Sequence, residues 1–321
     1  MIVVLTNSAD ATADHLCGLL VQSGIEYLRL DTDTSFFETR VYFRDGSARL
    51  VLAEKELSPQ DVSHLWCRRP KPLRLGRSHD PAEADNIDRE MSEAVEGFLA
   101  HVGIDRWINH PCRNAMASHK MEQLSRASRM GLPVPRTLVT QVPEDLRSFL
   151  SECGNEVVVK PLASGYLERT PPDVDSVIYA NHVTTDSLKN IASLAACPTL
   201  FQERILDKTD VRTTYIDGRT ISIAIKSPNR LGAEPAIDIR RDNMAGVHYE
   251  LVALPKHLEE LIQAYVASYG LRFAAIDLAF DRLGRWFFFE INPNGQWAWL
   301  DQRADAGIGR CLLSSMADFS E

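Results

Sequence analysis

Cysteines are few in this chain, and none lie close together. Six cysteines are scattered along 321 residues, and no two form a C-x-x-C pair. Zinc sites and the disulfide frameworks of small secreted domains depend on clustered cysteines. We therefore expect reduced core thiols, and neither a zinc site nor a set of disulfide bonds.

Long apolar runs are also missing. No stretch approaches the length of about eighteen apolar residues that a membrane-spanning helix needs. The N-terminal apolar run, residues 1–5, is short and has no basic residues before it, unlike a signal peptide. We expect a soluble, cytoplasmic protein with no membrane partner.

Positive charge is in deficit. The chain has 35 lysines and arginines against 44 acidic residues, a formal net charge of -9. A chain of this charge repels the phosphate backbone of nucleic acids. Nucleic acid is therefore not an expected partner.

The first turn lacks the glycines of a dinucleotide site. Residues 2–5, 10–23 and 26–30 predict a β-α-β unit, but the sequence between its first strand and helix is Thr6-Asn7-Ser8-Ala9-Asp10. A Rossmann site needs G-x-G-x-x-G there. A dehydrogenase using this unit is excluded.

The composition is that of a globular protein, with 45% hydrophobic and 25% charged residues, and the length predicts two or three domains. Apolar periodicity and turn residues predict further strands over 64–67, 156–160 and 199–205, helices over 81–102, 114–130, 143–152 and 255–269, and hairpins about Asp45-Gly46 and Asp217-Gly218. Residues 163–176 have no periodicity and predict a mobile loop.

The last apolar stretch predicts a β-hairpin that carries metal ligands. A loop at residues 281–284 would pair Phe280 with Arg285 and place Asp277 opposite Phe288. Glu290 and Asn292 then share the face of Asp277, with Asp277 and Glu290 as diagonal neighbours about 7–8 Å apart. Two carboxylates and an amide are oxygen ligands for Mg²⁺, which also binds nucleotide phosphates.

An isolated E-x-N pattern is more often just the end of a strand. Here the preceding residues, 286–289, are apolar on both faces and predict a buried strand. A carboxylate at the end of such a strand needs a cation or hydrogen-bond donors. This context favours the metal site.

Lys120 on a predicted helix and Lys160 at the end of a predicted strand are candidates for the phosphates of ATP. The strand that contains Gln202, Glu203, Arg204 and Ile205 is a candidate for binding adenine through its backbone. Asp207 or Asp210 are candidates for the ribose hydroxyls. Arg212 could hold a carboxylate or an acyl phosphate, or form a cross-strand ion pair.

Arg68 and Arg69 follow an apolar strand near the start of the chain. They could bind acidic residues of a peptide, or they could provide surface charge or an ion pair between domains.

Taken in order, these segments resemble those of the ATP-grasp carboxylate-amine ligases. They are Lys120, Lys160-Pro161, Gln202-Glu203-Arg204, Asp210-Val211-Arg212, Asp277, and Glu290-Ile291-Asn292-Pro293-Asn294-Gly295. Other segments resemble the microviridin-type and related graspetide maturases, namely Trp66-Cys67-Arg68-Arg69-Pro70, Trp107-Ile108-Asn109-His110-Pro111, Lys120 with Gln123-Leu124, and Gly295-Gln296-Trp297.

The resemblance implies an α/β chain with the ATP-grasp fold, in which two α+β lobes clamp ATP. A small α/β pre-ATP-grasp domain would cover 1–112, lobe 1 would cover 113–205 with the mobile loop, and lobe 2 would cover 206–321 with the metal hairpin. Lys120 and Lys160 would contact phosphates, and Asp277, Glu290 and Asn292 would hold two Mg²⁺. Arg212, with Arg240 as a second candidate, would face the reacting acyl group or a phosphate.

The implied activity is ATP-dependent ligation that forms ADP and an acyl phosphate. Asp or Glu side chains of a ribosomally made precursor peptide would be phosphorylated and joined to Ser, Thr or Lys of the same peptide as ester or amide macrocycles. The peptide would have a leader and an acidic, hydroxyl-rich core, and the enzyme could be a homodimer. Two alternatives stay open: a ligase that joins amino acids or extends a protein terminus, and an inactive nucleotide-binding scaffold.

Overall fold

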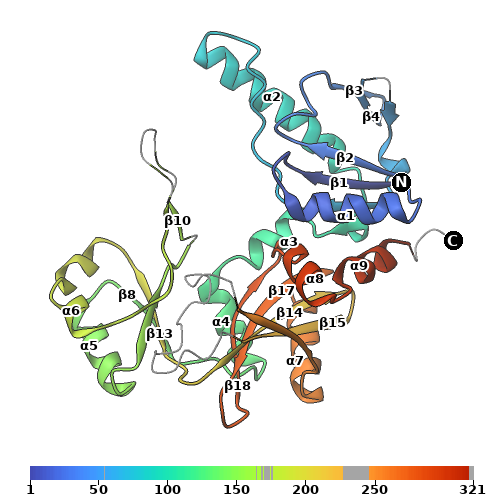
Figure 1. Cartoon of the computed structure of the whole chain (residues 1–321). Helices are drawn as coiled ribbons and strands as arrows, with labels where there is room; N and C mark the ends of the chain where they lie inside the picture. Colours follow the sequence, from blue (N-terminus) through green and yellow to red (C-terminus); the bar gives the residue numbers. More distant parts are fainter. Residues whose placement is uncertain are drawn as a thin grey trace.

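The computed structural model of the chain describes residues 1–53, 55–163, 165–167, 169, 174, 176–226 and 246–317 (Figure 1). Three larger sheets organise these residues. We name them the N-terminal sheet (β2-β1-β6-β7), the middle sheet (β12-β9-β13-β8) and the C-terminal sheet (β16-β15-β14-β17-β18). No described helix has both the length and the apolar character needed to cross a membrane.

The N-terminal sheet is parallel, as the β-α-β pattern predicts. Its strands are β1 (Ile2–Thr6), β2 (Tyr27–Asp31), β6 (His64–Cys67) and β7 (Trp107–Ile108), and its helices are α1 (Ala11–Gln22) and α2 (Pro81–Leu99). A smaller antiparallel sheet of β3 (Arg40–Arg44), β4 (Ser47–Leu52) and β5 (Lys55–Leu57) extends this part. The hairpin predicted about Asp45-Gly46 is therefore confirmed.

The middle sheet is antiparallel and lies at the left of Figure 1. It contains β8 (Thr137–Thr140), β9 (Val157–Lys160), β12 (Asn181–His182) and β13 (Thr199–Glu203), with α5 (Pro143–Glu152) and α6 (Thr185–Leu188) beside it. Leu146, Phe149 and Leu150 of α5 pack on Phe201 of β13. The pattern of residues 143–152 predicted this helix with the same bounds.

The C-terminal sheet is also antiparallel. Its strands are β14 (Thr209–Ile216), β15 (Arg219–Lys226), β16 (His248–Val252), β17 (Phe273–Phe280) and β18 (Trp286–Asn292); α4 (Lys120–Arg129), α7 (Lys256–Ala267), α8 (Ala298–Ala304) and α9 (Ile308–Ala317) accompany it. Ile276 and Ile291 pack on α4 and α7 on one face. Because side chains alternate along a strand, Phe273 and Asp277 point to the other face.

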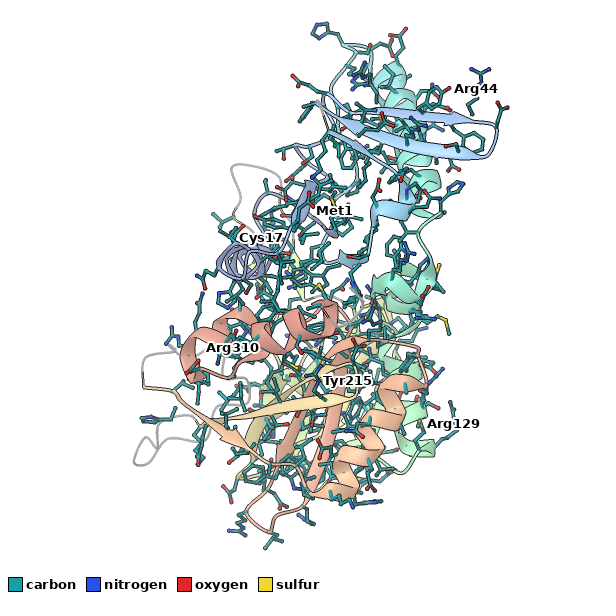
Figure 2. The ribbon with its side chains drawn as sticks, turned by 90° about the vertical axis from the view of Figure 1, so that its right-hand side faces the viewer. Met1, Cys17, Arg44, Arg129, Tyr215 and Arg310 are labelled. Atoms are coloured by element: carbon teal, nitrogen blue, oxygen red, sulfur yellow. The ribbon has the colours of Figure 1, made fainter. Side chains whose placement is uncertain are left out.

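That other face is covered by a hydrophobic core over only part of its length. Phe273 joins a second hydrophobic core with α1, α8 and α9, in which Trp66 and Trp297 are almost fully buried. Figure 2 shows α1, which carries Cys17, above α9, which carries Arg310. Asp277, four residues further along β17, lies beyond this core, and its partly exposed side chain can face a ligand.

Two predicted elements are wrong in detail. The helix expected over 114–130 is two helices, α3 (Pro111–Met116) and α4, because the carbonyl of Ala117 accepts from the side chain of Gln123 instead of continuing the first helix. In the segment 163–176, expected as a loop, β10 (Tyr166–Leu167) pairs with β11 (Ser176–Val177). The remainder of that segment lies largely outside the described residues.

Candidate active site

The hairpin of β17 and β18 places two carboxylates directly opposite each other. Asp277 pairs with Glu290, and Ala275 pairs with Asn292. The three candidate metal ligands therefore come from adjacent strands and one face of the sheet. The prediction that these side chains converge is confirmed by the register.

The predicted register itself is wrong. Phe280 pairs with Trp286 and Leu278 with Phe288, and the ladder then shifts by one residue between Asp277 and Leu278. The extra residue is Phe289, which has no partner on β17. A bulge of this kind turns side chains at the edge of a sheet; here it brings Glu290 opposite Asp277 instead of diagonal to it.

Arg212 extends the site on the neighbouring strand β14. It is the cross-strand partner of Asp277, and its Nη1 donates to Asp277 Oδ1. The cross-strand ion pair that the sequence left as an alternative is thus present. Arg212 Nε is buried without a hydrogen-bond partner among the described residues, so this guanidinium keeps a donor free.

Two lysines, one from a helix and one from a strand, lie near the carboxylates. Lys120, the first residue of α4, has its Nζ 3.5 Å from Glu290 Oε2 and donates to Pro161 O at 2.7 Å. Lys160, the last residue of β9, donates to Gln202 Oε1 at 2.7 Å. Its Nζ lies 4.4 Å from the ring centroid of Phe289, a cation–π distance.

Burial and charge set the pKa values here. Burial lowers the pKa of Lys160 to about 8, further favoured by Lys208, although Glu290 opposes it. Burial raises the pKa of Asp277, and the neighbouring Glu290 adds to the shift against the effect of Arg212. Burial also acts to raise the pKa of Glu290, but Lys120, Asn292 and Lys160 outweigh it and the net pKa is lowered.

The donor set fits Mg²⁺ better than a transition metal. Among the described residues no group of three or more His, Cys, Asp and Glu side chains is placed to hold a metal. Two carboxylates and one amide leave coordination positions for phosphate oxygens and water, as Mg²⁺ requires. Asn292 Nδ2 donates to Glu290 Oε1 at 3.1 Å, so the amide already lies against the carboxylates.

The strand proposed for adenine lies beside Lys160 but ends earlier than expected. β13 ends at Glu203, so Arg204 and Ile205 follow it. Gln202 is buried and binds Lys160, whereas Glu203 pairs with Arg136 and Arg204 pairs with Glu156. The side chains of Glu203 and Arg204 are thus engaged in ion pairs, and their backbone N–H groups donate to the carbonyls of Arg136 and Glu156.

The two ribose candidates differ in position. Asp210 lies at the start of β14 and pairs with Lys208, while Asp207 is half exposed and lies 3.6 Å from Arg282 Nη1. Asp210 contributes to the electrostatics of Lys160, so it borders the site. Arg240 lies outside the described residues.

Arg68 connects the N-terminal sheet to the turn after β18. It is 1% exposed, lies 3.7 Å from Asp10 through Nε, and donates to Asn294 O. Burial lowers its pKa to about 10, although Asp10 opposes the shift. Arg68 therefore pairs with an acid of its own part of the chain and reaches the C-terminal part through a hydrogen bond to a carbonyl, not through an ion pair; Arg69 is exposed.

Sequence reasoning missed several residues at the site. Lys208 is a third lysine, 5.8 Å from the Phe289 ring centroid. Asn109 binds the backbone of Arg272, Phe273 and Pro293, and so ties together both ends of the hairpin. Gln123 binds β18. The only sequence signal was that Asn109 and Gln123 fell within segments that resembled the maturases.

No protein-family model and no curated protein matches the chain. Solved structures do match it over nearly its whole length. The macrocyclase MdnC bound with precursor peptide MdnA, from Microcystis aeruginosa MRC, superposes with a TM-score of 0.82 at 25% identity, covering 99% of each chain.

The RiPP-associated ATP-grasp ligase of Chryseobacterium gregarium, in complex with ADP and a leader and core peptide, gives a TM-score of 0.84 at 25% identity over 100% of this chain and 97% of its own. The macrocyclase MdnB from Microcystis aeruginosa MRC gives 0.75 at 26% identity over 98% of each chain. The fold class predicted from the sequence is confirmed: the chain is an ATP-grasp ligase, and it resembles the RiPP-associated members of that superfamily.

Proposed function

We propose that this enzyme uses ATP and Mg²⁺ to activate Asp or Glu side chains of a ribosomally made precursor peptide, and joins them to Ser, Thr or Lys of the same peptide. The observation that carries the proposal is the convergence of Lys120, Lys160, Arg212, Asp277 and Glu290 from four separate segments of the chain. The resemblance to ligases solved with ADP, Mg and precursor peptides supports it.

The first step transfers the γ-phosphoryl group of ATP to a carboxylate oxygen of the peptide, which releases ADP and leaves an acyl phosphate. Lys120 and Lys160 would hold the phosphates as point charges. Asp277, Glu290 and Asn292 would hold Mg²⁺, which neutralises phosphate charge when bound.

In the second step a hydroxyl or amine of the peptide attacks the acyl carbon. A carbon–oxygen or carbon–nitrogen bond forms, inorganic phosphate leaves with the bonding electrons, and the proton of the nucleophile passes to solvent or phosphate. The free Nε donor of Arg212 is suited to the negative charge that develops on the acyl oxygen. The enzyme needs no nucleophile of its own, because positioning and electrostatics provide the catalysis.

The finer assignments belong to the same proposal. Adenine binding at Gln202 to Ile205 and ribose binding at Asp207 or Asp210 follow from the sequence pattern. Domains over 1–112, 113–205 and 206–321, and a role for Arg240 at the acyl group or phosphate, follow from the family resemblance. An acidic, hydroxyl-rich core and a homodimer also follow from the family resemblance. A cytoplasmic location follows from the scattered cysteines and the missing signal-peptide pattern.

The test combines the purified enzyme with ATP, Mg²⁺ and the peptide encoded beside its gene. We expect peptide-dependent ADP release and the loss of one water per ring in the mass spectrum. Asp277→Asn and Glu290→Gln should abolish both while the thermal transition stays cooperative. Glu144→Gln, an exposed carboxylate on α5, serves as the control and should keep full activity.

The alternatives give different outcomes. A gain in peptide mass would mean that the enzyme adds residues, and ATP binding without turnover would mean an inactive scaffold. Full activity in Asp277→Asn and Glu290→Gln would refute the metal assignment.

A further inference from the structure

Gln123 lies on α4, one helical turn after Lys120, and is 2% exposed. Its helix packs against β18, which is the outer strand of the C-terminal sheet. The free side of an outer strand leaves backbone N–H and C=O groups without partners in the sheet. The side chain of Gln123 takes up two of those groups.

Both ends of the Gln123 amide bind the same residue of the strand. Nε2 donates to Ile291 O at 3.0 Å, and Ile291 N donates to Oε1 at 3.2 Å. Nε2 also donates to Ala117 O at 2.6 Å. The primary amide thus substitutes for one residue of a further strand, and its two contacts fix both the position and the orientation of the Ile291 backbone.

Ile291 is the residue between Glu290 and Asn292. Its own side chain is buried in the core shared with α4 and α7, so the side chains on either side of it point to the opposite face of the sheet. Whatever holds the backbone of Ile291 therefore sets the direction of both candidate ligands. Supports of this kind around metal ligands typically change metal affinity about 10–100-fold when they are removed.

The same helix is also held by α7. Tyr265 of α7 donates from its hydroxyl to Gln123 O at 3.1 Å. Lys120, on the same helix, reaches Glu290 at 3.5 Å. A shift of α4 against β18 would therefore change the lysine and the ligands together.

We propose that Gln123 is a positioning residue for the Mg²⁺ site, which holds Glu290 and Asn292 in ligand geometry through the backbone of Ile291. The inference rests on the proposed use of Mg²⁺ with a nucleotide, and it does not depend on which peptide is the substrate.

The experiment measures ADP binding by calorimetry, once with Mg²⁺ and once with EDTA. In Gln123→Leu, which keeps the volume and removes both hydrogen-bonding ends, we expect the Mg²⁺-dependent gain in affinity to fall at least tenfold. Gln123→Glu keeps the acceptor for Ile291 N and loses the donor, so its gain should lie between those of Gln123→Leu and the wild type. If Gln123→Leu does not fold, the ADP affinities of Gln123→Glu test the inference.

Thr140→Val is the matched control, because Thr140 is also buried and binds Asp145 Oδ2 at 2.7 Å and Val142 N at 2.9 Å, away from the hairpin. Thr140→Val should be less stable than the wild type, but its gain in ADP affinity with Mg²⁺ should be unchanged. A folded Gln123 variant whose gain stays within twofold of wild type, or an equal loss in Thr140→Val, overturns the inference. The wild type could fail to remove water from the peptide and still show the expected differences in Mg²⁺-dependent ADP affinity among the variants. In that case the proposed peptide chemistry fails and this inference stands.

Discussion

Lys160 carries its charge in a poorly solvated position. Its ammonium group binds Gln202 and lies on the ring of Phe289, and burial lowers its pKa to about 8. A lysine with an ordinary pKa stays charged over the whole range in which enzymes work. Lys160 instead loses its proton in mildly alkaline solution when no nucleotide is bound.

Nucleotide binding should therefore depend on pH. Above pH 8 the free enzyme must take up a proton at Lys160 before it can contact a phosphate, so ADP affinity without Mg²⁺ should fall by up to about tenfold per pH unit. Below pH 8 the affinity should be flat, because Lys160 is already charged. Calorimetry at pH 7, 8 and 9 measures this effect. Lys160→Arg, whose guanidinium stays charged, should remove the dependence; a flat wild-type profile from pH 7 to 9 would disprove the assignment.

Sequence reasoning singled out several residues that the structure brings together, and their roles stay predictions. Asp277, Glu290, Asn292 and the two lysines have side chains whose chemistry restricts their roles, and the structure brings them together. Lys208 and Gln123 could not be recognised in this way. An isolated lysine or glutamine is compatible with a solvated surface, and only the contacts show otherwise.

At the level of elements, the turn after β18 is packed without spare room. A Cβ on Gly295 would lie 2.2 Å from Ala275 Cβ and 2.8 Å from Arg212 Nη2. Both atoms belong to strands that carry site residues. The absence of a side chain at position 295 therefore allows the turn to approach the sheet closely.

Gly295→Ala should lower stability by about 1–3 kcal/mol, the usual range for overpacking, and should reduce peptide-dependent ADP release because Arg212 is displaced. Chemical denaturation and an ADP assay measure the two effects. Adding Ala275→Gly removes the closer clash, so the double variant should recover part of the lost stability. If the stability losses of Gly295→Ala and Ala275→Gly simply add in the double variant, the two positions are not in contact.

Elements with strong periodicity were predicted well, and exceptions have local causes. The bounds of β6 and α5 were found from apolar pattern and proline alone. The bulge at Phe289 was not foreseeable, because Trp286 to Phe289 is apolar at every position and the alternation that sets register is missing. The break between α3 and α4 depends on a side chain that binds across it, which no local propensity reports.

At the level of the whole molecule, Trp297 joins the N-terminal sheet to the rest. Its ring lies 5.5 Å from that of His15 on α1 and 6.4 Å from that of Trp66 on β6, and it is fully buried. His15 also lies 3.1 Å from Asp301 of α8. A large apolar contact of this kind holds the two parts in one arrangement.

Trp297→Ala should lower the free energy of unfolding by about 3–5 kcal/mol, because it leaves a large cavity between the two parts. Denaturant unfolding followed by circular dichroism measures this loss. Trp299→Ala is the control, since Trp299 is half-buried against Tyr249 and should cost clearly less. Equal losses in the two variants would contradict the interface role of Trp297.

The sequence did not predict this packing between parts. Neither α8 nor α9 was predicted, although both lie in the core that buries Trp297. Their apolar residues complete a surface contributed by α1 and β1. A pattern confined to one segment carries no information about which distant segment will cover it.

The two phosphate-binding candidates belong to different bodies. Lys120 begins a helix that packs on the C-terminal sheet beside Glu290, whereas Lys160 ends a strand of the middle sheet. A rotation of the middle sheet about its connections would carry Lys160 away, break the contact of Lys120 with Pro161 O, and leave Lys120 beside Glu290. Lys120 and Arg212 would then stay at the metal site in both arrangements, and the distance of Lys160 from them would report whether the two sheets are closed on the triphosphate.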